Sequence, residues 1–195
     1  MIFRAPCFVV FAIGAAQAAA WQPTETTKHY TITGTSGSAL YASIGERGPE
    51  PSVGVRAIAY TSWDLKWRRD YQPRNGGCEL VSALPFLSIT YTLPKPAEQL
   101  AGTTAKNWET FSDGMVEHEH FHGVLLRQMT DRIIADTVGL RTDNDANCQK
   151  IRARVLENVK AAFEDYSKQS AEFDRVEMST GGHVHGLILQ LVNGG

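Results

Sequence analysis

The first half of the chain alternates between apolar and polar residues, and this period of two predicts β-strands. We expect a short strand at residues 29–33 and a long strand at residues 55–71, with a bulge near Trp63. A return strand is expected at residues 78–93, where Pro85 marks an edge or a bulge because proline lacks the backbone N–H that pairs strands.

Two local patterns complete this half. Asn75-Gly76-Gly77 stands between the two long strands and predicts the tight turn of a hairpin. Residues 36–46 carry apolar side chains at helical spacing, behind Ser36 as a helix cap and ahead of Gly48-Pro49 as a stop. The first half is therefore predicted to be an antiparallel hairpin sheet with one short helix.

The second half changes to a helical period. Apolar residues recur every three or four positions from about residue 105 to 138, and again from 146 to 173. Gly139 ends the first of these helices, and Asn144-Asp145 caps the second. The predicted fold class is α+β, with the hairpin sheet packed on long helices.

The N-terminal residues have the pattern of a secretory signal peptide. Arg4 precedes an apolar run at residues 8–15, and small residues before Trp21 form a cleavage site. Neither this run nor any later segment is long enough for a membrane span. We therefore expect a secreted or periplasmic protein in which residues 1–20 are the signal peptide and residues 21–195 are a single domain.

The net charge and the number of cysteines indicate which partners and which cellular compartment fit the protein. A formal net charge of -2 gives no basic surface for nucleic acid. Cys7 lies within the signal peptide, which leaves Cys78 and Cys148 as a pair in an oxidising compartment, where one disulfide is expected. By closing a loop of about 70 residues, it would stabilise the fold by about 4 kcal/mol on the chain-entropy estimate.

The candidate chemistry lies in the first long helix. Residues 118–122 read His-Glu-His-Phe-His, so His118 and His122 are four positions apart and lie on one helix face. Two imidazoles in this arrangement can bind one zinc ion, and Glu119 can serve as the general base of a metalloprotease. Both histidines share the stripe of core residues, and burying them is costly without a metal or hydrogen-bond partners.

A zinc site needs a third protein ligand. The histidines other than His29 fall into two groups, 118–122 and 183–185, as expected for one metal centre assembled from two segments. The sequence leaves acidic alternatives open, namely Asp174, Glu164, Glu172 and Glu157. Asp174 could also act as a hydrogen-bond partner of a ligand histidine.

The chain resembles a bacterial family of predicted secreted zinc-dependent proteases. The resemblance covers nearly all of the chain after the signal peptide and rests on residues 43–49, 63–67, 91–96, 118–123, 172–178 and 184–194. It implies a zincin-like fold, bound Zn²⁺ and His185 as the third ligand. In this family the position of His183 is commonly another residue, so His120 and His183 are additional histidines here.

The expected activity is hydrolysis of a peptide or protein substrate by zinc-activated water, with Glu119 as the catalytic base. The substrate would pair with an exposed strand, and the candidates for stabilising the developing negative charge are His183, His120 and Tyr166. Two other classes remain open. A non-catalytic periplasmic zinc-binding protein would use the same histidines, and a structural or interaction domain would bind no stoichiometric metal.

Overall fold

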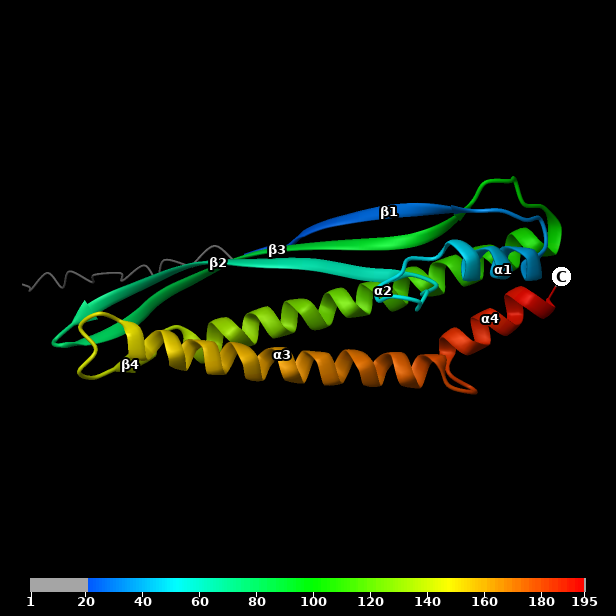
Figure 1. Cartoon of the computed structure of the whole chain (residues 1–195). Helices are drawn as coiled ribbons and strands as arrows, with labels where there is room; N and C mark the ends of the chain where they lie inside the picture. Colours follow the sequence, from blue (N-terminus) through cyan, green and yellow to red (C-terminus); the bar gives the residue numbers. More distant parts are fainter. Residues whose placement is uncertain (1–20, 195) are drawn as a thin grey trace, which may run out of the picture.

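The computed structural model describes residues 21–194, so the predicted signal peptide lies outside the described residues. The elements follow in the order β1 (Thr24–Ile32), α1 (Gly37–Arg47), β2 (Tyr60–Arg74), β3 (Gly77–Pro96), α2 (Gly102–Thr137), β4 (Arg141–Thr142), α3 (Gln149–Met178) and α4 (His183–Asn193). The long β2–β3 ribbon runs beside helices α2 and α3, and α1 and α4 lie together at the end of the molecule near the C-terminus (Figure 1).

The sheet is mixed, with strand order β1-β3-β2 and with β4 paired to β3. The antiparallel β2–β3 hairpin is confirmed, but β1 is parallel to β3, so the prediction of a purely antiparallel sheet was wrong. The parallel pairing follows from the connection between β1 and β2. Strand β1 ends opposite Pro96 of β3 and β2 begins opposite Thr92, so the two strands meet the same end of the sheet. Because β3 lies between them and runs against β2, it must run with β1.

The hairpin turn follows from its sequence. Asn75 and Gly76 have φ angles of 52° and 76°, the positive values that a two-residue type I′ turn requires. Arg74 and Gly77 on either side form the first strand pair. The predicted turn is therefore confirmed, and it sets the register of the long ribbon.

Prolines occur in β3 only where that strand has one neighbour. Pro85 pairs with β2 at a position that β1 does not reach, while Pro94 and Pro96 pair with β1 beyond the start of β2. Proline is tolerated at such edge positions because no second ladder needs its missing N–H. The irregularity in the ribbon lies between Asp70 and Tyr71, instead of near Trp63.

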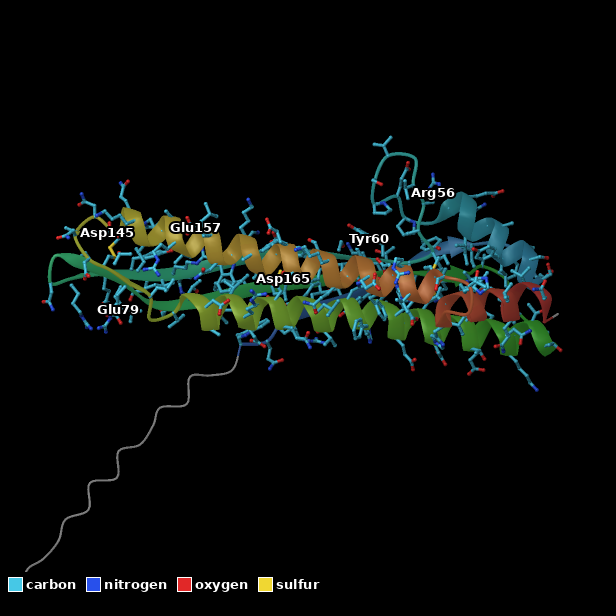
Figure 2. All side chains as sticks on the ribbon, turned by 90° about the horizontal axis from the view of Figure 1, so that it is seen from below. Arg56, Tyr60, Glu79, Asp145, Glu157 and Asp165 are labelled. Carbon is cyan, nitrogen blue, oxygen red and sulfur yellow. A yellow bond between two sulfur atoms is a disulfide. The ribbon has the colours of Figure 1, made fainter. Side chains whose placement is uncertain are left out.

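Residues 55–59, which were expected to begin a strand, form the end of a loop. The Tyr30 hydroxyl donates to the carbonyl of Ile58 at 2.6 Å, and Arg56 donates to the carbonyl of Gly48 at 2.7 Å. The first contact ties the loop to strand β1 and the second ties it to the end of α1, and Figure 2 shows Arg56 on a segment that stands out from the helices.

Both long helices were predicted, with ends that differ by a few residues. Helix α4 was not predicted, because its apolar run is short and follows two glycines, Gly181 and Gly182. Its buried side chains join those of α1 and α2 in one core cluster, which includes Leu40, Phe111 and Leu187. No helix in residues 21–194 is long and apolar enough to span a membrane.

The predicted disulfide between Cys78 and Cys148 is present, with the two Cα atoms 5.2 Å apart. It joins the turn end of the ribbon to the start of α3, beside Asp145 in Figure 2. A disulfide fits a protein that resides in an oxidising compartment, such as the periplasm or the extracellular space.

Candidate metal centre

Helices α2 and α3 run antiparallel, and their facing stripes build the centre. His118 and His122 lie one turn apart on α2, and both are buried, with 8% and 7% of their surface exposed. Helix α3 places Ser170 and Asp174, also one turn apart, opposite them. The pairing follows from the helical spacing of four residues in both segments.

Three ligand atoms converge at this point. The Nε2 atoms of His118 and His122 lie 3.2 and 3.0 Å from the same carboxylate oxygen of Asp174. The two Nε2 atoms are 3.3 Å from each other. These three residues form the one group of histidine, cysteine or acidic side chains in residues 21–194 whose geometry could hold a metal ion.

Neighbouring side chains fix the two imidazole rings. Phe173 stacks on the His118 ring with a centroid distance of 4.8 Å and meets the His122 ring edge-on at 5.5 Å. The second ring nitrogen of His122, Nδ1, lies 3.0 Å from the Ser170 hydroxyl. The corresponding Nδ1 of His118 is buried and has no hydrogen-bond partner among residues 21–194.

The charge on Asp174 is stabilised by the histidines. Burial by itself would raise the pKa of this carboxyl, but hydrogen bonds from His118 and His122, together with their charge, hold the pKa well below its usual range. Asp174 therefore presents an ionised oxygen at neutral pH, which is the form that binds a cation.

Glu119 lies beside this group and is 4% exposed. The Thr61 hydroxyl on β2 donates to its Oε2 atom at 2.5 Å. Burial raises the pKa of the Glu119 carboxyl, and the hydrogen bond from Thr61 opposes that rise. The arrangement holds the carboxyl in one orientation next to the metal-ligand group.

The centre opens into a cleft of about 530 Å³. Its walls come from α1, α2, α3, the start of β2 and the loop before β2. The lining includes His118, Glu119, His122, Asp174, Ser170, Tyr166, Tyr60, Thr61, Trp63 and Met115. A small molecule or a peptide side chain can therefore reach the ligand group from this side.

The structure places Asp174, and not His185, with the two helix histidines. His185 lies on α4, where its Nδ1 accepts a hydrogen bond from the backbone of Gly181 at 3.4 Å, and neither it nor His183 lines the cleft. His120 is exposed on α2, with its ring 4.6 Å from that of Tyr91. Of the three candidates for charge stabilisation, only Tyr166 lines the cleft.

The other acidic alternatives lie elsewhere on α3. Glu157 and Glu164 are exposed, and Glu164 lies 3.8 Å from Lys160. Glu172 is engaged by Arg175 at 2.6 Å.

The residues that sequence reasoning missed are Thr61, Ser170, Phe173 and Glu177, whose Oε2 lies 3.9 Å from His118 Nδ1. The last three share one face of α3 with Asp174, because residues three and four positions apart lie on the same side of a helix. A search of that face for polar and aromatic residues would have found them. No sequence pattern singles out Thr61, because its contact with Glu119 depends on how β2 packs on α2.

The donor set fits a metal ion. In a tetrahedral site with zinc bonds of about 2.0 Å, neighbouring ligand atoms are about 3.3 Å apart. The three observed separations of 3.0, 3.2 and 3.3 Å are close to that value. A metal on Nε2 would also leave the proton of each ring on Nδ1, where Ser170 can accept from His122.

Residues 27–185 match the family described as bacterial proteins of unknown function (DUF922), and the chain belongs to this family. No curated protein and no solved structure matches the chain. The family description assigns no activity, so the chemistry has to be argued from the centre itself.

Proposed function

We propose that the chain is a secreted zinc-dependent metallopeptidase with a zincin-like centre, in which His118, His122 and Asp174 hold the zinc and Glu119 is the general base. The observation that carries this proposal is the convergence of three ligand atoms within 4.8 Å of one another, beside a buried glutamate and at the base of an open cleft. Catalytic zinc sites combine three protein ligands with one open position.

Bound zinc would supply a water of lowered pKa and would polarise the carbonyl of the substrate. Glu119 accepts the proton of the water and passes it to the leaving amine. Burial raises the pKa of Glu119, which suits a group that must both gain and lose a proton near neutral pH. Thr61 keeps the carboxylate oxygen from turning away by donating to it.

The substrate lies along β2. This strand is at the edge of the sheet, and Tyr60, Thr61 and Trp63 at its start line the cleft. Its unpaired backbone groups can pair with an extended peptide, as in strand addition to a sheet edge. Burial raises the pKa of the Tyr166 hydroxyl, which therefore stays protonated and can donate to the oxygen that becomes negative.

The alternative is a non-catalytic zinc-binding protein. That function predicts additional ligands that close the open position, and His120 and His183 are the available candidates. Neither belongs to the group that converges on Asp174, and this arrangement supports the enzyme over the metal store.

The first test is the metal content of the purified chain, measured by elemental analysis. We expect one zinc per chain, and its loss in both His118→Ala and Asp174→Ala. His185→Ala is the matched comparison, because it removes the other candidate third ligand and should retain the zinc. Zinc lost only in His185→Ala would contradict the ligand set, and stoichiometric iron would indicate that the two histidines and the carboxylate serve oxygen chemistry.

The second test separates catalysis from metal storage. Glu119→Gln should bind zinc as the parent chain does and lower hydrolysis of a peptide library by at least about a hundredfold, since general-base catalysis contributes about 10²–10⁴ in rate. Undiminished hydrolysis in this variant would remove Glu119 from the mechanism. A parent chain that binds zinc and cleaves nothing would favour the storage function.

A further inference from the structure

One buried nitrogen of the centre has no hydrogen-bond partner. His118 Nδ1 is inaccessible to solvent and unpaired within residues 21–194. The nearest charged group is the carboxylate of Glu177 on α3, whose Oε2 lies 3.9 Å away. That separation is longer than a hydrogen bond, and a buried polar atom left unpaired is costly.

The two ligand histidines differ in this respect. His122 Nδ1 lies 3.0 Å from the Ser170 hydroxyl, so its ring is held at both nitrogens. Ser170, Asp174 and Glu177 follow one another on α3 at spacings of four and three residues, which places them on one helix face. Helix α3 thus presents a ligand in the centre of this face and one potential partner for each imidazole on either side.

Metal binding would make this carboxylate a suitable partner for the ring. When Nε2 of His118 holds a metal, the proton of a neutral ring lies on Nδ1, the nitrogen that faces the carboxylate of Glu177. The buried nitrogen would then be a donor with an acceptor beside it.

The environment of Glu177 leaves it available for this contact. Its side chain is only 18% exposed, and its one ionic contact in the described part of the chain is with His118. Gly182 packs directly on the last turn of α3, where an added Cβ would be 2.4 Å from the carbonyl oxygen of Glu177. The turn after α3 therefore fixes the backbone from which the carboxylate reaches His118.

We propose that Glu177 is the positioning residue of the centre: its carboxylate accepts the Nδ1 proton of His118 when the metal is bound, orients the ring and strengthens its bond to the metal. This inference rests on the proposed function, because it requires the metal. Such outer carboxylates are worth about 10–100-fold in metal affinity.

The test measures zinc affinity by competition with a chromophoric chelator, so it does not depend on activity. Glu177→Ala should weaken zinc binding by about 10–100-fold. Glu177→Gln should lose less, because the amide oxygen still accepts a hydrogen bond. Glu172→Ala is the matched control, since it removes an exposed glutamate of the same helix that pairs with Arg175, and it should bind zinc as the parent does.

Substitution with Co²⁺ supplies a second measurement, because its visible absorption reports the ligand field. The spectrum should change in Glu177→Ala and be partly restored in Glu177→Gln, which a merely structural effect on folding would not produce. Unchanged zinc affinity in Glu177→Ala, or an equal loss in Glu172→Ala, would overturn the proposal. A Glu177→Gln variant that loses zinc as completely as Asp174→Ala would make Glu177 a direct ligand, which also overturns it.

The two proposals fail in different ways. A parent chain that takes up no zinc removes both the metallopeptidase function and the role of Glu177. If the parent chain binds zinc and Glu177→Ala binds it equally tightly, only the proposed role of Glu177 is contradicted.

Discussion

Gly123 leaves the space that the Tyr91 hydroxyl occupies. A Cβ at residue 123 would lie 2.1 Å from that oxygen, which donates to Glu25 at 2.9 Å. Tyr91 is 1% exposed, so its ring cannot move into solvent without losing its core contacts. The glycine next to His122 therefore allows α2 to lie close against β3. This close approach of the strand explains why residue 123 has no side chain.

Gly123→Ala should destabilise the chain by about 1–3 kcal/mol in urea unfolding, because overpacking outweighs the gain in helix propensity of about 1 kcal/mol. Gly45→Ala is the control, since nothing lies within 4 Å of its added Cβ, and it should be neutral or stabilising. Tyr91→Phe removes the obstructing oxygen, so the double variant should lose less than the two single variants together. Additive losses would show that the clash is not the cause.

At the residue scale, the sequence predicted the part of the centre that local spacing determines. His118, Glu119 and His122 are neighbours on one helix, so their relation needed no tertiary information. The third ligand depends on which segment packs opposite them. The pairs His118–Asp174 and His122–Ser170 are both centred on Ala146, in the connection between α2 and α3. Treating these helices as an antiparallel pair would have selected Asp174, whereas grouping the histidines indicated residues 183–185 and the family resemblance implied His185.

At the scale of the element, the start of α3 depends on one carboxylate. Asp145 accepts hydrogen bonds from the backbone N–H groups of Gln149, Lys150 and Ile151 and from the Thr142 hydroxyl. Burial by itself would raise the pKa of Asp145, but these hydrogen bonds outweigh it and lower the pKa to about 2. The cap therefore satisfies several of the N–H groups that begin a helix without a partner.

This cap predicts a pH dependence of stability. The unfolded carboxyl has a pKa of about 3.9, so Asp145 should stabilise the fold fully above about pH 4 and progressively less as the pH falls toward 2. Asp145→Ala should lower the unfolding temperature most at neutral pH, and its difference from the parent should shrink below about pH 4. The exposed Asp143→Ala serves as control, and a difference that grows in acid would contradict the assignment.

The elements differ in how far local pattern determines them. The long helices and the hairpin turn follow from periodicity and from turn chemistry, which act within a few residues. Helix α4 was missed because eleven residues after two glycines gain their stability from packing on α1 and α2 more than from propensity. The parallel pairing of β1 depends on where the chain crosses the end of the sheet. No local sequence pattern predicts that crossing.

At the scale of the whole molecule, the two ends are stabilised differently. The core cluster that contains α1 and α4 lies at one end, and the Cys78–Cys148 disulfide joins the turn end of the ribbon to the start of α3 at the other. Figure 1 shows these two ends of the fold. Along α3, Cys148 and Asp174 are separated by about 40 Å at 1.5 Å per residue. The sequence predicted the disulfide from compartment and cysteine number, but not this separation.

This separation predicts that the disulfide affects global stability and not the centre. Cys78→Ala combined with Cys148→Ala, or reduction of the parent chain, should lower the free energy of unfolding by about 4 kcal/mol, because the crosslink restricts the unfolded chain. Under native conditions the zinc affinity should remain that of the parent, since the disulfide constrains neither α2 near His118 nor α3 near Asp174. Urea unfolding and chelator competition on the same samples test both parts. A tenfold loss of zinc affinity on reduction would show that strain or fraying at the ribbon end reaches the ligands through α3, and that the two ends act as one unit.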